Sequence, residues 1–493
     1  MIFAALKRLG RHSLIYALGP AVQKVLGFVL LPFVTIWIGT TANYGVLEIG
    51  GVTVAVAAQV LGINLLHGMT RFHAQYDTDE ERHTLISTTL LMLAASTGAA
   101  LGLAWVFRDF GARVLFDSET YAPALVAVFA ILFFQTVGQV GLRWLQVLER
   151  SITYGVVTTV KLVLEIGLKV WLLILGLTYM GAFYSVLGCE ILAALVVVVI
   201  LVRKCGLRFS RPMARRLFVY SAPLFLSGLC MFVLHQADRF FVQHFCGASE
   251  VGLYGLAYKL GTIGNAIFLE AFALIWFPFA FSIQSDEEMR AITRKVLTYF
   301  NLALCAATLG LSLFAREIVH AMAAPEFHPA WPALPIIALG YLFWGLYQVV
   351  STIFYRLERT WTVGVLACGA AVLNLVLNAL LVPAHGFMGA AWATLATFGV
   401  LAAATWTMAE RTLPVGYEWG RILGPFLLAA GLYGLSALIP EWPLWAVIGT
   451  KLGLVLLLPA VLLLGGFLVR EERDKLRELW RTLRPGRTVR NPR

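Results

Sequence analysis

Charged side chains are scarce in this chain. Asp, Glu, Lys and Arg make up 13% of its 493 residues, whereas an average soluble domain has about 25%. Hydrophobic residues make up 60%. A soluble protein of this length would need far more polar surface to cover its core, so the composition excludes a soluble globular fold. The apolar runs are continuous and do not alternate with polar residues, which excludes a transmembrane β-barrel.

The sequence also lacks the patterns that carry chemistry. Its six cysteines form no CxxC pair, and most lie in apolar runs, where cysteine packs as a small hydrophobic residue. There is no Walker loop, no HExxH, no catalytic-triad pattern and no loop long enough for an enzymatic domain. We therefore expect no enzyme activity, no disulfide framework, no metal site and no cofactor.

Apolar runs of about 20 residues recur along the chain, and this is the length that crosses a bilayer as a helix. Backbone groups in hydrocarbon must pair internally, so we expect an all-α integral membrane protein. The pattern predicts about fourteen transmembrane helices. The predicted spans are 13–38, 44–68, 84–107, 121–146, 154–177, 180–202, 217–244, 251–281, 293–315, 331–354, 362–382, 387–409, 421–439 and 444–469.

Basic residues are unevenly distributed between the two sets of helix ends. Of the 38 Lys and Arg residues, 29 lie at one set of ends or in the tail after residue 469, and only Arg108, Arg113 and Arg316 lie at the opposite set. Cytoplasmic loops are enriched in Lys and Arg. We therefore expect a multi-pass protein of the inner (cytoplasmic) membrane with both termini in the cytoplasm. The net charge of +11 then reports topology and contact with membrane lipids, not binding of nucleic acid.

Short matches recur in the same order about 208 residues apart. They predict two parallel six-helix repeats around a central cavity, an arrangement that is typical of transporters. The matching pairs are Tyr44-Gly45 with Tyr254-Gly255, Arg108 with Arg316, Pro123-Ala124-Leu125 with Pro332-Ala333-Leu334, Leu148-Glu149-Arg150 with Leu357-Glu358-Arg359, and Met180-Gly181-Ala182 with Met388-Gly389-Ala390.

The repeat divides the chain into four parts. The expected parts are an N-lobe at 1–204 with helices one to six, a C-lobe at 205–411 with helices seven to twelve, two extra helices at 412–469, and a basic tail at 470–493. Apolar residues recur at helical spacing among the basic residues of the tail, which predicts an amphipathic helix on the membrane surface. A solvated tail or a contact with a cytoplasmic partner is the open alternative.

Predicted helices one and two of the N-lobe each carry a charge within the membrane, where a charge is costly and faces a cavity or a partner. Lys24 borders a polar face of helix one. We interpret it either as a contact to a substrate phosphate or as the partner of a carboxylate on helix two. Glu48 on helix two is that partner, or it carries a proton that couples transport to an ion gradient.

The C-lobe carries the densest charged cluster. His235, Asp238 and Arg239 lie within one turn of helix seven and indicate a functional role; a charge pair that only fixes the helix position is the alternative. In helix eight, Lys259 and Glu270 are eleven residues apart, so we expect them to share a face. Lys259 is a second cation for the cavity, or else the partner of Asp238.

Helix five carries Lys161, Glu165 and Lys169 at steps of four residues. This spacing predicts a ladder of ion pairs on one face. The matching positions in helix eleven are Asn374 and Asn378, and we expect this face to be structural in both halves.

With helix number, repeat and charges in place, the chain resembles the multidrug/oligosaccharidyl-lipid/polysaccharide exporter superfamily. It looks most like the polysaccharide branch, which contains the O-unit and lipid-linked oligosaccharide flippases. The stretches that carry the resemblance are Ala237-Asp238-Arg239-Phe240-Phe241, Val251-Gly252-Leu253-Tyr254-Gly255-Leu256-Ala257-Tyr258-Lys259, Trp276-Phe277-Pro278, Asn374-Leu375-Val376-Leu377-Asn378 and Gly386-Phe387-Met388-Gly389-Ala390-Ala391.

The resemblance implies two lobes that open alternately inward and outward around a cationic cavity. The implied substrate is a polyprenyl-pyrophosphate-linked oligosaccharide, whose bare charge would be prohibitive in hydrocarbon. Lys24, Arg239 and Lys259 are the candidate pyrophosphate contacts, and the candidate ion-coupling residues are Glu48, His235, Asp238 and Glu270.

Two other functions stay open at this stage. A multidrug antiporter of the same superfamily would extrude cationic compounds, and in helices one, two, seven and eight three bases balance three acids, which does not decide between the two. A membrane subunit that anchors a polysaccharide synthase would bind a glycosyltransferase or polymerase through the basic tail and loops.

Overall fold

The computed structural model describes residues 25–438 and 442–467, without the side chains of 264–267. Every regular element in that part of the chain is a helix, as expected for an all-α membrane protein. The first half comprises α2 (Leu31–Trp37), α3 (Thr41–Val60), α4 (Leu65–His73), α5 (Asp79–Val106), α6 (Arg108–Phe116), the 3₁₀ helix η1 (Glu119–Tyr121), α7 (Ala122–Val147), α8 (Ser151–Ile174) and α9 (Thr178–Cys205).

The second half repeats this order. It comprises α10 (Arg211–Gln236), α11 (Asp238–Cys246), α12 (Ala248–Ser282), α13 (Asp286–Leu313), α14 (Ala315–Met322), the 3₁₀ helix η2 (Pro325–Ala330), α15 (Ala333–Arg356) and α16 (Thr360–Thr412). Two further helices follow, α17 (Trp419–Ser436) and α18 (Leu444–Leu464).

The two halves also share details of local structure. Helices α5 and α13 both begin with Asp-Glu-Glu, and the hydroxyls of Thr78 and Ser285 cap them by accepting a hydrogen bond from a backbone N–H of the first turn. The Leu-Glu-Arg matches form the same turn, with a positive φ of 56° at Glu149 and 58° at Glu358. Equivalent sequence therefore produces equivalent backbone in both halves.

Within the described residues, eight helices are long and apolar enough to cross a membrane, and the number rises to ten if each of two bent helix pairs is one span. This is fewer than the fourteen spans expected. Part of the difference is α16, whose 53 residues form one element although about 20 suffice to cross a bilayer. Gly386, at φ 58°, interrupts α16 between the predicted spans 362–382 and 387–409. Helices α8 and α17 are not among the eight, and the first predicted span lies partly outside the described residues.

Three expected spans are broken in the structure. Helices α3 and α4 meet at 49°, α10 ends before Ala237 and continues as α11, and α12 bends by 50° between Ile263 and Phe268. This bend lies between Lys259 and Glu270, whose expected common face assumed a straight helix.

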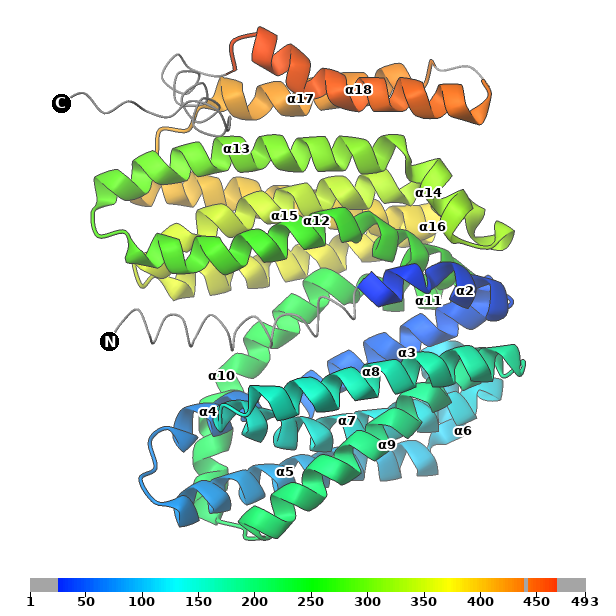
Figure 1. The fold of residues 1–493 in the computed structure, drawn as a ribbon, viewed down its shortest axis with the longest axis vertical. Coiled ribbons are helices and arrows are strands. Elements are labelled where there is room, and N and C mark those ends of the chain that lie inside the picture. Colours follow the sequence, from blue (N-terminus) through cyan, green and yellow to red (C-terminus); the bar gives the residue numbers. More distant parts are fainter. Residues whose placement is uncertain (1–24, 439–441, 468–493) are drawn as a thin grey trace, which may run out of the picture.

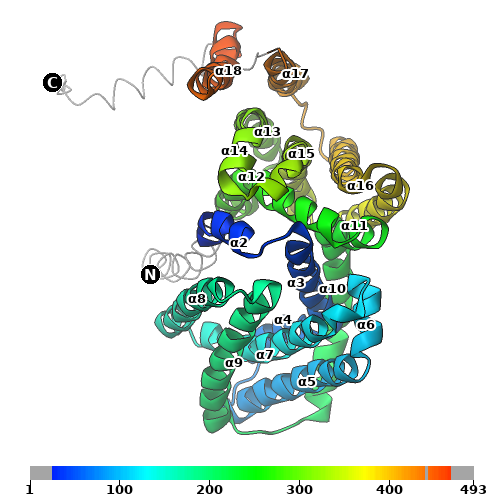
Figure 2. The same cartoon turned by 90° about the vertical axis from the view of Figure 1, so that its right-hand side faces the viewer.

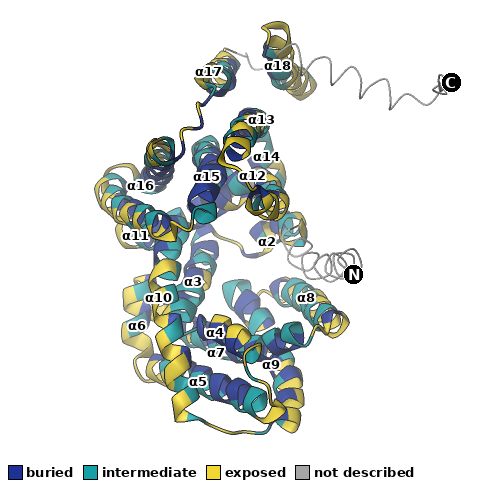
Figure 3. Cartoon of the chain, turned by 90° about the vertical axis from the view of Figure 1, so that its left-hand side faces the viewer, coloured by how far each residue is buried: buried dark blue, intermediate teal, exposed yellow. Residues whose placement is uncertain are grey.

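The helices form two stacked bundles, one with α3 to α9 and one with α11 to α16, and α10 passes from one to the other (Figure 1). We call these two bundles the lobes. The central helices α7 and α15 are the most buried spans, with 61% of the apolar window of each buried, against 6% for α18. Figure 2 shows α17 and α18 on the far side of the second bundle, and Figure 3 shows their exposed outer surfaces. Although α10 follows the N-lobe in sequence, its first half packs against α4 and α5.

The basic loops gather at one end of both bundles, on the left in Figure 1, and we name this the basic end. Helices α6 and α14 lie at the opposite end. Helices α3 and α12 both begin at the opposite end and run towards the basic end. Their N-terminal residues therefore meet at the opposite end.

Candidate functional site

Helices α3 and α12 cross in backbone contact and join the two lobes at the opposite end. A Cβ atom on Gly45 would lie 1.8 Å from the carbonyl oxygen of Ala248, and one on Gly252 would lie 2.0 Å from that of Thr41. Only glycine permits this approach. Nearby, the hydroxyls of Thr41 and Ser249 share a hydrogen bond of 2.5 Å. We call three residue pairs together the interlobe contact. They are Thr41–Ser249, Gly45–Gly252 and the Glu48–Lys259 ion pair described next.

Lys259 carries the only charge-to-charge interaction within that contact. Its ammonium donates to Glu48 Oε1 over 2.5 Å and to the Tyr44 hydroxyl over 2.9 Å. The side chain of Lys259 is 51% exposed, whereas that of Glu48 is 11% exposed. Glu48 is held close to α12 because Gly255 has no side chain there; a Cβ atom would lie 2.6 Å from Glu48 Cγ. The lysine thus has an accessible side, and the carboxylate largely does not.

Arg239 is buried within the second lobe. Its Nη1 donates to Asp238 Oδ1 over 2.9 Å and to the carbonyl oxygen of His235 over 3.0 Å, where α10 ends and α11 begins. The side chains of Arg239 and Asp238 are 6% and 2% exposed. The Tyr254 hydroxyl donates to Asp238, and the guanidinium lies 4.1 Å from the ring centre of Tyr258. Arg239 and Asp238 thus pair with each other and are surrounded by aromatic rings.

His235 connects to the same cluster through tyrosine hydroxyls. Its Nδ1 lies 3.1 Å from the Tyr341 hydroxyl, which lies 2.6 Å from that of Tyr258. The ring also packs edge-on against Trp344, with ring centres 4.6 Å apart. Residues 235–239 therefore form one half-buried to buried network, and the expected clustering of His235, Asp238 and Arg239 is present in the structure.

The remaining candidates are placed differently from each other. Lys24 lies outside the described residues, and so does the expected tail helix. Glu270 is exposed on the part of α12 that follows its bend, whereas the α12 residues of the interlobe contact precede the bend. The alternative that pairs Lys259 with Asp238 is wrong, because Lys259 pairs with Glu48 and Asp238 with Arg239.

The charged face of α8 is only partly the ladder expected from spacing. Lys169 pairs with Glu165 over 3.2 Å, but Lys161 pairs with Glu190 of α9 over 2.5 Å. A neighbouring helix thus competes successfully for the first lysine. At the matching positions of α16, the buried Asn378 amide donates to the side chain of Asn374 over 3.1 Å.

Sequence reasoning missed two contacts between the lobes. Tyr44 packs edge-on against the fully buried Phe327 of η2, with ring centres 5.4 Å apart. Gln243 of α11 donates to Asp117, at the end of α6, over 2.9 Å. Tyr44-Gly45 belongs to a repeat match, which is a signal of position but not of partner. Phe327 and Asp117 carry no sequence signal that would connect them to the other lobe.

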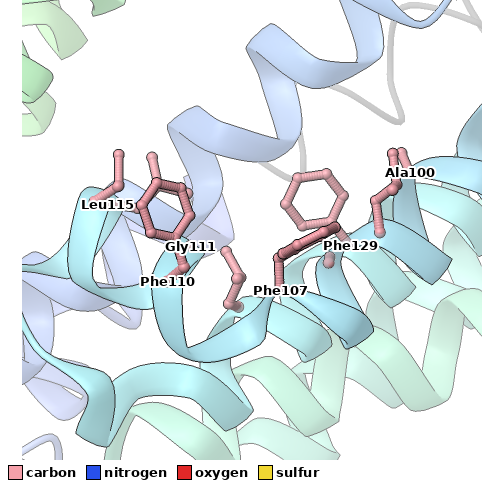
Figure 4. Close-up of a pocket in the computed structure, with 10 residues that line it drawn as sticks. Ala100, Phe107, Phe110, Gly111, Leu115 and Phe129 are labelled. Carbon is pink, nitrogen blue, oxygen red and sulfur yellow. The ribbon is translucent and has the colours of Figure 1, made fainter.

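Two hollows lie away from these charged residues. One, of about 700 Å³, lies between α5, α6 and α7 and is lined by apolar side chains including Phe107, Phe110 and Phe129 (Figure 4). The other, of about 380 Å³, lies between α13, α15, α16 and α17 and includes Trp392 and Phe426. Neither has a charged residue in its lining. Within the described residues, no group of three or more His, Cys, Asp or Glu is arranged to hold a metal ion.

Comparison with known proteins finds relatives that are similar in sequence. A family model described as polysaccharide biosynthesis protein matches residues 40–332. The chain is 24% identical over 233 residues to the probable low-salt glycan biosynthesis flippase Agl15 of Haloferax volcanii, covering 46% of this chain and 49% of that protein. It is 24% identical over 373 residues to the putative O-antigen transporter of Shigella flexneri, covering 69% of this chain and 85% of that protein. The match thus spans about half the length of the first relative.

Solved structures share the fold. The lipid II flippase MurJ in an inward closed conformation aligns with a TM-score of 0.74 at 12% identity, over 91% of this chain and 98% of that one. An inward-facing multidrug resistance MATE family transporter of the MOP superfamily aligns with a TM-score of 0.58 at 18% identity, over 78% of this chain and 94% of that one. At such identities the likeness shows the fold alone.

Proposed function

Because this chain belongs to the family of polysaccharide biosynthesis proteins, we propose that it flips a lipid-linked glycan across its membrane by alternating access between its two lobes. It is a multi-pass membrane protein of a transporter family, and it is not an enzyme. The relatives described as a glycan biosynthesis flippase and an O-antigen transporter support this class of substrate.

The topology that we propose has fourteen spans in two six-helix lobes and two extra helices, with the basic end in the cytoplasm. The distribution of Lys and Arg supports this orientation. The interlobe contact would then close the outer side, in a state that receives substrate from the cytoplasmic leaflet. The inner membrane is the proposed location.

The interaction of Lys259 with Glu48 is the observation that carries the proposal. It joins the two lobes at one end, and its lysine is half-exposed. Opening that end requires the pair to separate, and an accessible ammonium suits an anionic headgroup. A pyrophosphate linked to a polyprenyl chain would provide such a group while the chain stays in the bilayer. Lys24 remains a second candidate contact, and Glu48, His235, Asp238 and Glu270 remain candidates for ion coupling.

Transport in vesicles tests the proposal. The purified full chain is reconstituted, a polyprenyl-pyrophosphate-linked oligosaccharide is placed in one leaflet, and an added glycosidase reports its arrival in the other. We expect transport that Lys259→Ala reduces at least about tenfold. Lys451→Ala is the matched control, because Lys451 also forms an ion pair, with Glu317, but on α18. Absence of flipping by the wild-type protein would contradict the proposal.

The MATE-like fold keeps the antiporter as a second candidate. Cells that express the protein are exposed to cationic dyes. Dye extrusion that is lost in Asp238→Asn, without glycan flipping in vesicles, would favour the antiporter. Co-purification of a glycosyltransferase with a chain that flips nothing would instead favour a synthase subunit.

A further inference from the structure

We infer that Lys259 exchanges partners during transport: the phosphate group of the lipid-linked substrate displaces Glu48 from Lys259, and this exchange releases the interlobe contact. The inference rests on the proposed function and adds to it how substrate binding is coupled to opening of the outer side. A single lysine would thus bind substrate and hold the lobes together, but not at the same time.

The hydrogen bonds of the ammonium permit such an exchange. An ammonium has three N–H donors, and those of Lys259 serve Glu48 and Tyr44, which leaves one donor for an incoming anion. The lysine side chain is 51% exposed, so an anion reaches it before the pair with Glu48 breaks. Once there, a pyrophosphate with more than one negative charge competes with a single carboxylate for the same cation.

The rest of the interlobe contact is uncharged. Buried apolar residues of both lobes pack around it in one cluster, including Val46 and Ile49 of α3 and Val251 of α12. Gly45 and Gly252 bring backbones together without side chains that interdigitate. Thr41 and Ser249 contribute one hydrogen bond, and Tyr44 contributes one ring contact with Phe327. The Lys259–Glu48 ion pair is therefore the one charged interaction among these groups. An anionic substrate compensates Lys259 for the loss of this pair.

An empty carrier would remain closed for the same reason. Separating Lys259 from Glu48 without a substitute leaves a carboxylate that is largely buried and a cation without its partner, which is unfavourable. A neutral lipid provides no replacement charge. The arrangement thus makes opening depend on the phosphate of the substrate, not on its chain.

Opening is measured by labelling from outside. Thr41 and Ser249 face each other in the interlobe contact, so Ser249→Cys reports its separation through reaction with a membrane-impermeant maleimide in vesicles of the full chain. The unsubstituted protein, with its six cysteines, gives the background. The probes are a polyprenyl pyrophosphate and the matching uncharged polyprenol.

We expect the pyrophosphate to raise labelling about tenfold and the polyprenol to leave it unchanged. In Glu48→Gln, labelling should already be high without ligand. The same variant should bind the pyrophosphate about tenfold more tightly, because the competing carboxylate is gone. Lys259→Ala should also label without ligand, but it should lose binding. A merely structural pair would weaken or preserve binding in both variants alike.

Transport in the same vesicles separates the two ideas. If the wild-type protein flips the glycan but labelling ignores the pyrophosphate, or if Glu48→Gln binds it no more tightly, the exchange is refuted and the flippase stands. If the wild-type protein flips nothing and labelling does not respond, the proposed function fails as well. If Ser249→Cys fails to flip, Thr41→Cys replaces it as the reporter under the same criteria.

Discussion

Two ion pairs of this protein lie in different environments. Asp238 and Arg239, adjacent in sequence, have side chains 2% and 6% exposed and are enclosed by tyrosines of their own lobe. Lys259 and Glu48, 211 residues apart, join the two lobes, and the lysine is 51% exposed. The depth of a charge within a membrane helix thus indicates function less than the place of its partner does. A partner on a part of the molecule that must move indicates a functional role.

This comparison changes what we expect of Arg239. From sequence alone it is a candidate pyrophosphate contact alongside Lys24 and Lys259. In the structure the guanidinium is committed to Asp238, to the carbonyl of His235 and to the ring of Tyr258. We propose that Arg239 holds the junction of α10 and α11 and that Lys259 meets the substrate.

The largest expected effect is on the buried pair. Arg239→Ala leaves Asp238 buried without its cation, and breaking a buried pair costs about 3–5 kcal/mol. We expect a large loss of folded protein, measured by thermal unfolding and by membrane protein level. The double variant Asp238→Asn with Arg239→Gln should recover part of it. Full stability of Arg239→Ala would mean that the two ion pairs do not differ as described.

The next effect concerns the glycine crossing beside Lys259. In Gly45→Ala the new methyl group would lie 1.8 Å from a backbone oxygen, so the helices must separate, and overpacking of this kind costs about 1–3 kcal/mol. We expect raised maleimide labelling of Ser249→Cys and reduced transport. Gly51→Ala, on the same helix with open space around it, is the control and should leave both unchanged. Equal behaviour of the two variants would contradict the proposed role of the crossing.

Removing the half-exposed cation should affect transport more than stability. Lys259→Ala leaves the largely buried Glu48 without its cation, but the lysine that it removes is 51% exposed, so we expect a smaller loss of stability than in Arg239→Ala. We expect transport to fall at least about tenfold, with Lys451→Ala near wild type. Thermal unfolding and flipping, measured together, distinguish the two residues. Lys259→Ala should mainly lose transport, and Arg239→Ala should mainly lose stability. Unfolding of Lys259→Ala as severe as that of Arg239→Ala would remove the distinction.

The smallest effect is a dependence on pH outside the spans. His320 of α14 and His328 of η2 lie with ring centres 3.9 Å apart, and η2 also provides the Phe327 that packs on Tyr44. Burial, then nearby His328 and Arg316, lower the pKa of His320, while Glu317, itself paired with Lys451, opposes the shift. The neutral imidazole is therefore favoured in the folded state.

The contribution of this contact is complete above the ordinary histidine pKa near 6.5 and is lost as pH falls through the lower folded value. We expect labelling of Ser249→Cys to rise below about pH 6.5, by less than about twofold because the site is exposed. His320→Gln should remove that rise. A pH response that persists in His320→Gln would assign it to another group.

Much of the fold was predictable because the signals are local. The all-α class follows from continuous apolar runs, since each helix pairs its own backbone groups. The Leu-Glu-Arg matches correspond to the same positive-φ turn in both halves. The clustering of His235, Asp238 and Arg239 was also predictable, since five consecutive residues cannot lie far apart.

Breaks and partners were less predictable. No proline or glycine marks residues 236–238, where α10 gives way to α11, and a local reading continues one helix there. Lys161 has Glu165 at the favourable spacing of four, yet it pairs with Glu190 of α9. Spacing along one helix specifies which side chains are near, but not which neighbour from another helix comes nearer.

The sequence by itself determined that this chain is helical and that it belongs in a membrane, because hydrophobic length and backbone hydrogen bonding act within single segments. Only the tertiary structure decided that Lys259 meets Glu48 while Arg239 remains with Asp238. Helix crossing at Gly45 and Gly252 sets those distances, and a contact between residues more than 200 positions apart depends on how whole helices pack.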